Sequence, residues 1–268
     1  CKVKIMLNIH PLYSSSSGNM FHIGTEKTNI LLDVGVSYKA INEGLKQIDK
    51  SLMDISAVLI THEHVDHIKG LSLLCRKNNI PIYACGKTAQ YLKDMLNDKN
   101  IPADIYSVNY GQPFKIKDIE ITPFETSHDA VCPCGYNIIT GNESLTYATD
   151  LGYVSDEVFE YLKLANYIVL EANYDKTMLD FGKYPYPLKH RIKSLTGHLS
   201  NDDAAMTVAR LANIGKDNFL FAHLSQNNNN PDILINTLED ELIKNDIPLS
   251  NVNLNIASKT LSCEVYNI

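Results

Sequence analysis

The sequence predicts an α/β protein in which two layered β-sheets are connected by helices. Short apolar, β-rich runs alternate with short helical stretches along all 268 residues. Hydrophobic residues make up 44% of the chain and charged residues 21%, a balance typical of globular proteins with a sizeable core. Apart from the serine run 14–17 and the asparagine run 227–230, we find no repeat, linker or low-complexity block. These observations favour one domain, residues 1–268, over two.

Seven apolar runs have the length and composition of buried strands: residues 29–33, 57–61, 80–84, 119–123, 145–149, 167–171 and 218–222. Helices are expected to begin near Ser37, Gly70, Lys87, Ser155, Ser200 and Pro231. Two of these starts have clear local signals. Ser200 followed by Asp203 resembles a capping box with Gly215 as its stop, and Asn230 with Pro231 makes an N-cap and first-position pair.

The composition excludes a disordered chain, a collagen and a membrane protein. Lys and Arg number 24 against 31 Asp and Glu, a net charge of −7, so the surface as a whole is not built to attract polyanions. A local basic patch is still compatible with that balance. No apolar run approaches the roughly 20 residues of a membrane-spanning helix, and residues 1–10 lack the continuous apolar stretch of a secretion signal. We therefore expect no membrane partner, and the sequence predicts no particular oligomeric state.

The six cysteines are scattered along the chain rather than spaced as a disulfide framework. This usage is typical of a reducing compartment, so we expect a cytoplasmic protein. Cys132 and Cys134 form Cys-Pro-Cys, one residue short of the usual metal or redox spacing. We expect them to be free thiols in a loop.

The segment Thr-His-Glu-His-Val-Asp-His, residues 61–67, carries the clearest chemistry. In extended backbone His62 and His64 point to the same side, so both can reach one metal ion. As the chain turns, Asp66 and His67 would address a second metal beside the first. A solvated polar turn is the alternative, but it would crowd three imidazoles together without a cation. The spacing therefore predicts a dinuclear metal site.

Three further candidate ligands each follow an apolar run. They are His128, Asp150 and His223, and each alone would more often be structural. Their shared position at strand ends places them at one edge of the sheets, the usual place for sites in α/β proteins. The carboxylate of Asp150 can bridge two cations.

The pattern H-x-H-x-D-H, followed by separate His, Asp and His residues, resembles the metallo-β-lactamase superfamily. Within it the chain is similar to the YycJ (WalJ) branch, cytoplasmic bacterial proteins regarded as 5′→3′ DNA exonucleases. The similar stretches are residues 14–19, 61–70, 148–154, 170–173, 184–189, 197–201 and 222–225. Met20 departs from the pattern, where a small hydroxyl residue is expected, and this puts one peripheral contact in doubt. The resemblance implies an αββα four-layer sandwich (metallo-β-lactamase fold) over the whole chain.

Carried over by position, the resemblance puts His62, His64 and His128 on a first metal. It puts Asp66, His67 and His223 on a second, with Asp150 bridging. Imidazoles and carboxylates without thiolates suit Zn²⁺ or Mn²⁺, with Fe as a further possibility. Two divalent metal ions roughly 3.5–4 Å apart would share a bridging hydroxide that attacks a phosphodiester. Asp66 would orient that hydroxide and act as a catalytic residue.

Glu171 and His198 look like the Glu–His pair that serves the scissile phosphate in nuclease members of the superfamily. Glu171 would orient the imidazole, while His198 would stabilise charge or protonate the leaving oxygen. The structural alternative for His198 is a helix-entry histidine bonded to backbone.

Substrate contacts are expected from three segments. Ser16, Ser17 and Asn19 lie in a serine-rich turn that can hold a phosphate. Residues 183–193 interleave tyrosines with cations, among them Lys189 and Arg191, as nucleic-acid grooves do. Ser225 completes the expected contacts. A solvated loop is the alternative for the turn and for the basic segment.

The leading hypothesis is a dinuclear metal-dependent phosphodiesterase that acts on DNA from a 5′ end. The first alternative is a small-molecule hydrolase, a glyoxalase-II-like thioesterase or a lactonase, which the Glu–His pair and the basic segment disfavour. A β-lactamase is disfavoured because no secretion signal is expected. An RNA-processing nuclease is closer competition, although we see no inserted second domain and no long arm for tRNA. A non-enzymatic metal-stabilised sensor is disfavoured by the complete ligand set.

Overall fold

Two seven-stranded β-sheets form the inner layers of the part of the chain that the structure, a computed structural model, describes: residues 7–262 and 264–268. The first sheet has the order β14-β1-β2-β3-β4-β5-β6 and the second β13-β12-β11-β10-β9-β8-β7. The strands of the first are β1 (Asn8–Ser15), β2 (Gly18–Gly24), β3 (Asn29–Leu32), β4 (Ala57–Ile60), β5 (Ile82–Cys85), β6 (Ile105–Val108) and β14 (Tyr266–Asn267). Those of the second are β7 (Phe114–Ile116), β8 (Ile119–Glu125), β9 (Cys134–Thr140), β10 (Glu143–Ala148), β11 (Tyr167–Glu171), β12 (Asn218–Ala222) and β13 (Asn253–Ile256).

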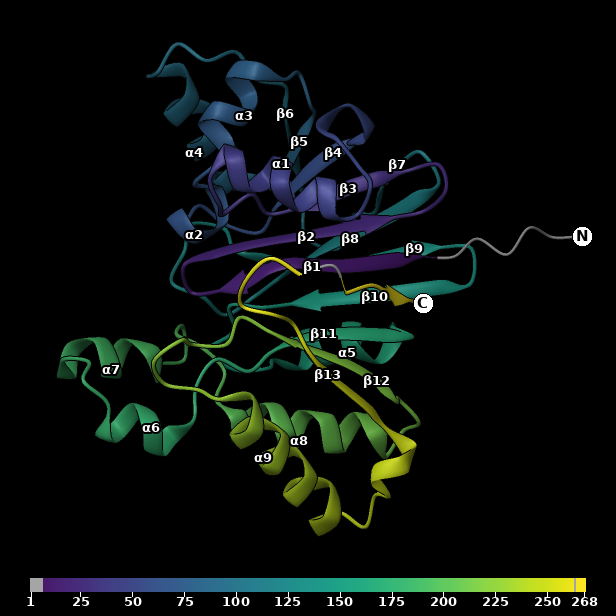
Figure 1. The fold of residues 1–268 in the computed structure, drawn as a ribbon, viewed down its shortest axis with the longest axis vertical. Helices are drawn as coiled ribbons and strands as arrows, with labels where there is room; N and C mark the ends of the chain where they lie inside the picture. The colour runs from purple at the N-terminus through teal and green to yellow at the C-terminus, as the bar shows by residue number, and fades with distance from the viewer. Residues whose placement is uncertain (1–6, 263) are drawn as a thin grey trace, which may run out of the picture.

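Helices cover both outer faces of this pair of sheets (Figure 1). Apolar side chains of α1 (Tyr38–Gln47), α3 (Leu71–Lys77) and α4 (Gly86–Asn97) pack on the first sheet. Those of α5 (Asp156–Leu164), α8 (Asn201–Ala212) and α9 (Pro231–Lys244) pack on the second. A third core fills the space between the sheets. This order of layers confirms the predicted αββα fold class.

The central strands are apolar along their whole length because both of their faces are covered. Every residue of β4 and of β11 is buried, including Glu171 at the end of β11. Parallel pairing of β3 with β4 and of β10 with β11 and β12 makes such continuous apolar runs typical. All seven predicted runs are strands here, although β8 pairs antiparallel with β7 and β9 and alternates buried with half-buried residues at its start. Only β5 begins late, at Ile82, after Pro81, which has no N–H to donate to a ladder.

The expected helix starts are also found, and most carry a side-chain cap. Ser37, Ser155, Ser200 and Asn230 are N-caps whose side chains accept a hydrogen bond from a first-turn N–H. Such caps satisfy backbone donors that have no partner inside the helix. After α8, the turn closes with Gly215 N–H donating to Ala212 O and a φ of +86° at Gly215, which a glycine adopts without strain.

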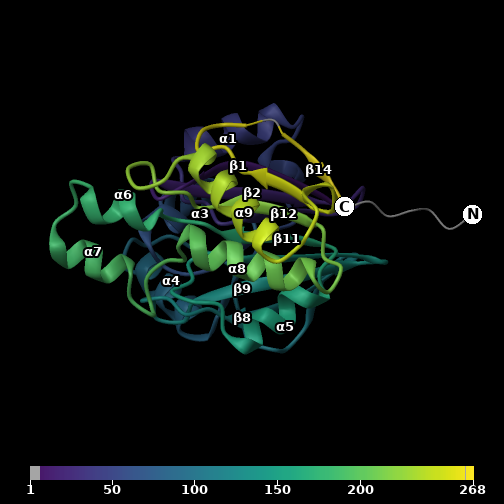
Figure 2. The same ribbon diagram turned by 90° about the horizontal axis from the view of Figure 1, so that it is seen from below.

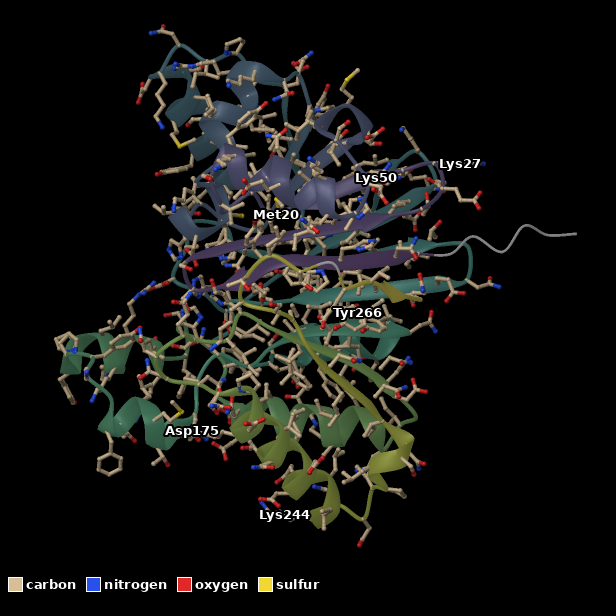
Figure 3. All side chains as sticks on the ribbon, viewed as in Figure 1. Met20, Lys27, Lys50, Asp175, Lys244 and Tyr266 are labelled. Atoms are coloured by element: carbon tan, nitrogen blue, oxygen red, sulfur yellow. The ribbon has the colours of Figure 1, made fainter. Side chains whose placement is uncertain are left out.

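The β1–β2 hairpin was not predicted. Pro11 lies at a register shift in β1, where a bulge accommodates its missing N–H. The serine-rich segment is therefore the end of one strand, a tight turn at Ser16 and Ser17, and the start of the next. Met20, labelled in Figure 3, is fully buried against α1, so its departure from the family pattern lies in the core.

The prediction of a loop holds for Cys132 but is wrong for Cys134, which is the first residue of β9 and is buried. Cys75, Cys85, Cys132 and Cys134 are free thiols, whereas Cys1 and Cys263 lie outside the described residues. Among the described helices, none has both the length and the apolar character needed to cross a bilayer.

Three short helices remain: α2 (Val65–Ile68), α6 (Lys176–Phe181) and α7 (Tyr186–Ile192). Helix α2 belongs to the histidine motif. Helices α6 and α7 project from one end of the sandwich, as the views in Figures 1 and 2 agree. Residues 183–193, where a solvated loop was one alternative, are thus partly helical.

Candidate metal centre

The candidate site is built at the ends of six strands. Asp33, His62, His128, Asp150 and His223 follow β3, β4, β8, β10 and β12, and Glu171 ends β11. Asp33, Asp150 and His223 have φ values of +59°, +58° and +59°, in the left-handed region that non-glycine residues rarely adopt. Asp33 and His223 directly follow the last residue of a strand, and one residue separates Asp150 from the end of β10. At each of these positions the left-handed conformation turns the chain sharply. Backbone strain of this kind is concentrated at functional sites.

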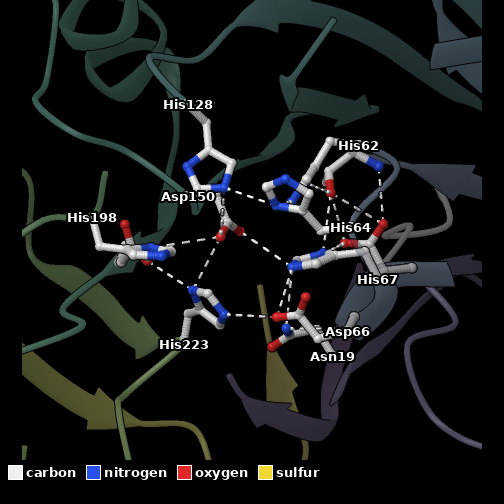
Figure 4. Close-up of polar contacts among 12 residues, drawn as sticks. Asn19, His62, His64, Asp66, His67, His128, Asp150, His198 and His223 are labelled. Carbon is white, nitrogen blue, oxygen red and sulfur yellow. Dashed lines mark hydrogen bonds and ion pairs between the residues drawn. The ribbon is translucent and has the colours of Figure 1, made fainter. Parts of the chain in front are cut away.

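Three imidazoles form the first ligand group. His62 Nε2 lies 3.0 Å from His64 Nδ1, and His128 Nε2 lies 3.2 Å from the same atom (Figure 4). Nitrogens bound to one tetrahedral Zn²⁺ at 2.0–2.1 Å would be separated by roughly 3.3–3.4 Å. The three nitrogens therefore converge at about the spacing of ligands around a single cation.

A second group is formed by Asp66, His67 and His223. Asp66 Oδ2 is 3.6 Å from His67 Nε2 and 3.4 Å from His223 Nε2. Asp150 lies between the two groups. Its Oδ1 is 3.7 Å from His128 Nε2, and its Oδ2 is 3.5 Å from His67 Nε2. One carboxylate oxygen thus faces each group, the arrangement expected of a bridging ligand.

Buried polar atoms without hydrogen-bond partners mark this pocket as a cation site. Asp150 Oδ2 and His223 Nε2 are both buried and unpartnered in the described structure. An unsatisfied buried polar group costs on the order of 1–3 kcal/mol, so such atoms call for an explanation. A bound cation supplies one, and imidazole and carboxylate donors without thiolates fit a divalent ion of the first transition row.

The charges of the pocket are balanced internally. Burial by itself would lower the pKa of His223, but the charge of Asp150 and the neighbouring carboxylates of Asp66 and Glu171 raise it to about 10. Burial likewise opposes ionisation of Asp66, yet the neighbouring His67 and His223 hold its pKa well below the usual range. Cations entering the pocket would replace protons on the histidines while leaving the carboxylates ionised.

The ring nitrogens that face away from the pocket are held by other groups. His67 Nδ1 donates to Asp33 Oδ2 over 2.7 Å, and His128 Nδ1 donates to Gly197 O over 2.9 Å. His223 Nδ1 donates to Glu171 Oε1 over 2.7 Å. Because a carboxylate or carbonyl only accepts, we assign the proton to Nδ1 in each ring, which leaves Nε2 free to bind a cation.

Asp33 is a residue that sequence reasoning missed. Its fully buried carboxylate accepts from the backbone N–H and hydroxyl of Thr61 as well as from His67. Thr61 Oγ1 also lies 3.0 Å from His62 Nδ1, so Asp33 supports one histidine of each group. The available signal was its place at the end of the run 29–33, the same position that pointed to Asp150 and His223.

Glu171 and His198 lie together beside Asp150. His198 Nδ1 donates to Glu171 Oε1 over 2.9 Å and lies 3.7 Å from Asp150 Oδ1. Glu171 also accepts from the backbone N–H groups of Leu151 and Leu199, and it is fully buried. Burial opposes its ionisation, but His198 and His223 hold its pKa below the ordinary range. The His198 side chain is 14% exposed, so it is not sealed from solvent as that of Glu171 is.

The residues expected at the substrate differ in their exposure and in their contacts. Ser16 is exposed, and Ser17 Oγ is bonded to Ser15 Oγ and Gln226 Nε2. Asn19 lies inside the pocket, where its Nδ2 is 3.2 Å from His67 Nε2. Ser225 is buried, and its hydroxyl accepts from Asn228 N–H.

The two basic residues are engaged with protein groups. Lys189 Nζ donates to Asp180 O over 2.8 Å. Arg191 makes a bidentate ion pair with Asp129: Nε donates to Oδ2 over 2.5 Å, and Nη2 donates to Oδ1 over 2.8 Å. Asp129 Oδ1 is 3.5 Å from His128 Nε2, so this pair ties α7 to the edge of the first ligand group.

Comparisons with known proteins bear on this geometry. The family model of the beta-lactamase superfamily domain matches residues 28–224. The chain is 42% identical over 226 residues to a Bacillus anthracis protein named exodeoxyribonuclease YycJ, covering 83% of this chain and 84% of that one. It is 36% identical over 237 residues to exodeoxyribonuclease WalJ of Streptococcus pneumoniae, covering 88% of each. Among solved structures, the metallo-β-lactamase fold protein YhfI of Bacillus subtilis aligns over 98% of this chain and 100% of its own, with a TM-score of 0.73 and 15% identity. The last likeness is one of fold alone.

Proposed function

The chain belongs to the metallo-β-lactamase superfamily, as its motifs led us to expect, and from this membership we propose that it is a metal-dependent nuclease removing nucleotides from the 5′ end of DNA. The observation that carries the proposal is the pair of ligand groups sharing Asp150, with the Glu171–His198 pair directly beside them. Relatives named exodeoxyribonucleases, similar over more than four fifths of both chains, support the same activity.

The proposed cofactors are two divalent metal ions, Zn²⁺ or Mn²⁺, with Fe as a further possibility. His62, His64 and His128 would hold one, Asp66, His67 and His223 the other, and Asp150 both. When bound, such a pair lowers the pKa of water into the neutral range and neutralises charge on a phosphodiester.

The chain's own residues would divide the remaining work. Asp66, whose side chain is 25% exposed, would orient the attacking water from the open side of the pocket. Glu171 fixes the His198 ring through Nδ1, which leaves Nε2 to deliver a proton to the departing oxygen of the sugar. Arg191 and Asp129 would position α7 against the rim.

We propose the cytoplasm as the place of action. All four described cysteines are free thiols, as is usual where glutathione and thioredoxin keep proteins reduced. DNA would be the nucleic acid bound there.

The test compares duplex DNA, single-stranded DNA and RNA, each labelled at the 5′ or the 3′ end, with Mn²⁺ or Zn²⁺ added. We expect label at the 5′ end of DNA to be released first as a mononucleotide. Asp66→Ala should abolish this release, whereas Asp94→Ala, an exposed change on α4, should not. His198→Gln should reduce cleavage by roughly 10²–10⁴-fold, the usual contribution of general acid–base catalysis.

Other outcomes would overturn the proposal. Cleavage of thioesters or lactones without cleavage of nucleic acid would mean a small-molecule hydrolase. Preferential cleavage of RNA would mean an RNA-processing nuclease. Full activity of Asp66→Ala would refute the role given to that carboxylate.

A further inference from the structure

Helices α6 and α7 form a basic arm on an acidic protein. We call residues 176–193 the arm; it projects from one end of the sandwich (Figure 2), and its Arg191 pairs with Asp129 at the first ligand group. It contains five of the 24 Lys and Arg residues and one of the 31 Asp and Glu residues. The arm thus carries a net charge of +4, whereas the rest of the chain carries −11. A single positively charged projection of this kind suits a polyanionic partner.

Most cations of the arm hold it in place rather than face solvent freely. Lys189 and Lys193 both bind Asp180, which joins α7 to α6. Lys176 pairs with Asp202 and Asp203 on α8, and Arg191 pairs with Asp129. Lys183 is exposed and has no ion-pair partner among the residues that the structure describes. It is therefore the cation that the arm presents to a ligand.

Lys183 lines a hollow of about 650 Å³ at the tip of the arm. The hollow is bordered by Met178, Phe181, Gly182, Tyr184 and Asn227. Phe181 is 88% exposed, so its ring is open to contact with a ligand. Asn227 Nδ2 donates to the Tyr184 hydroxyl over 2.9 Å, which joins the loop after His223 to the arm. The hollow thus combines an open aromatic face, a free cation and polar groups.

The hollow is close to the candidate metal centre along one continuous loop. Asn227 is four residues from His223, so their Cα atoms are at most about 14 Å apart. Gln226, between them, donates from Nε2 to Ser17 Oγ in the β1–β2 turn. At about 3.4 Å per stacked nucleotide, a strand leaving the centre reaches the hollow within roughly four nucleotides.

We propose that this hollow is a subsite for one unpaired nucleotide of the DNA substrate, a few nucleotides from the scissile phosphate. Phe181 would stack on the base and Lys183 would pair with a phosphate. The ligand must be single-stranded at this point, because a base inside a duplex is already stacked on both faces and cannot receive the ring. The inference rests on the proposed nuclease function and names the form of DNA that the protein engages.

The test measures hydrolysis and binding as a function of substrate length. Wild type and Phe181→Ala are compared on bis(p-nitrophenyl) phosphate and on single-stranded oligonucleotides of two to ten nucleotides. We expect the variant to match wild type on the ester and the dinucleotide. On the ten-nucleotide strand its KM should rise roughly 5- to 150-fold, the loss of one base–aromatic stack. Phe181→Tyr should restore the wild-type value. Met53→Ala should change nothing, because Met53 is an exposed residue of the short 3₁₀ helix η1 (Leu52–Asp54), outside the arm.

Lys183→Gln gives a second, independent readout. We follow the binding of a single-stranded ten-nucleotide DNA by fluorescence anisotropy at several salt concentrations. The slope of log K against log salt concentration should be about 0.7 less negative in the variant than in wild type, because one phosphate contact is lost. A length-independent effect of Phe181→Ala, or none, would overturn the subsite. Equal losses on blunt duplex and single-stranded DNA would do so too. If wild-type protein cleaves the ester but no nucleic acid, the proposed function fails instead, and oligonucleotide binding still decides the subsite.

Discussion

Replacing Asp33 by Asn should weaken metal binding without removing a metal ligand, because Asp33 orients the ligand His67 and does not itself belong to either ligand group. The substitution keeps the shape of the side chain and its acceptor oxygen for Thr61 N–H, 2.9 Å away. It turns the oxygen that faces His67 Nδ1 into an amide N–H₂ group. Two donors then face one another, so His67 is driven to carry its proton on Nε2. That is the nitrogen that must be free to bind the second cation.

The magnitude follows from the bond that is lost. A hydrogen bond to a charged group contributes about 1.5–3 kcal/mol, and removal of a residue that orients a metal ligand usually weakens metal binding 10- to 100-fold. We therefore expect Asp33→Asn to bind the cation of the second ligand group, that of Asp66, His67 and His223, roughly 10- to 100-fold less tightly. At saturating metal this corresponds to about 1.4–2.7 kcal/mol of stability, or a fall in Tm on the order of 5 °C.

The assay is isothermal titration of the chelator-treated protein with Zn²⁺, alongside thermal unfolding with and without metal. Asp118→Asn is the matched control, because Asp118 also accepts from two hydroxyls, those of Thr25 and Thr28, but contacts no histidine. Wild-type affinity for every bound cation in Asp33→Asn would refute the reasoning. So would an equal loss in the Asp118 variant.

Three further predictions concern the pH dependence of stability at His22, the close packing of Gly35 on the Asp66 backbone, and the removal of metal. Burial lowers the pKa of His22 to about 4, against about 6.5 when unfolded, so its contribution to stability is present above pH 6.5 and is lost as pH falls toward 4. His22→Gln should accordingly reduce the stability change between pH 7.5 and 5.5 by about 1 kcal/mol, measured by urea unfolding. Gly35→Ala should displace Asp66 and lower nuclease activity and metal content together, because a Cβ at Gly35 would lie 1.6 Å from Asp66 O. Chelation should destabilise wild type by about 2.7 kcal/mol relative to protein in metal at 100 times its Kd, measured by urea unfolding.

Each of these has a clear contrary result. An unchanged pH profile in His22→Gln would mean that this histidine titrates normally in the folded protein. Full metal content in Gly35→Ala would show that the α2 segment yields without moving Asp66. Identical unfolding with and without chelator would mean that no cation binds the native state preferentially.

The parts of the fold that the sequence predicts are those whose residues are constrained on both faces. Strands such as β4 and β11 are apolar throughout because helices cover one face and the other sheet covers the second. The β1–β2 hairpin escapes prediction because Pro11 and the serines are poor strand formers locally. Its extended conformation comes from pairing with β3, the next strand, and with β14 at the other end of the chain.

In the candidate site, too, the sequence predicts what depends on local pattern and not what depends on contacts between distant segments. Residues that chemistry requires at strand ends, such as Asp150 and His223, are visible as polar residues after apolar runs. Contacts that join distant segments are not visible. Asp33 reaches His67 across 34 residues, and Arg191 reaches Asp129 across 62. The sequence marks Arg191 as a cation among aromatics, but only the folded chain shows that a carboxylate already holds it.

The measurement that tests the metal centre most directly is the cation content and position in the loaded protein. Protein dialysed against Mn²⁺ or Zn²⁺ should contain about two equivalents per chain. Anomalous diffraction should then show two peaks roughly 3.5–4 Å apart, one beside His62, His64 and His128, the other beside Asp66, His67 and His223. A single peak, peaks away from Asp150, or a reproducible absence of metal after loading would contradict the account.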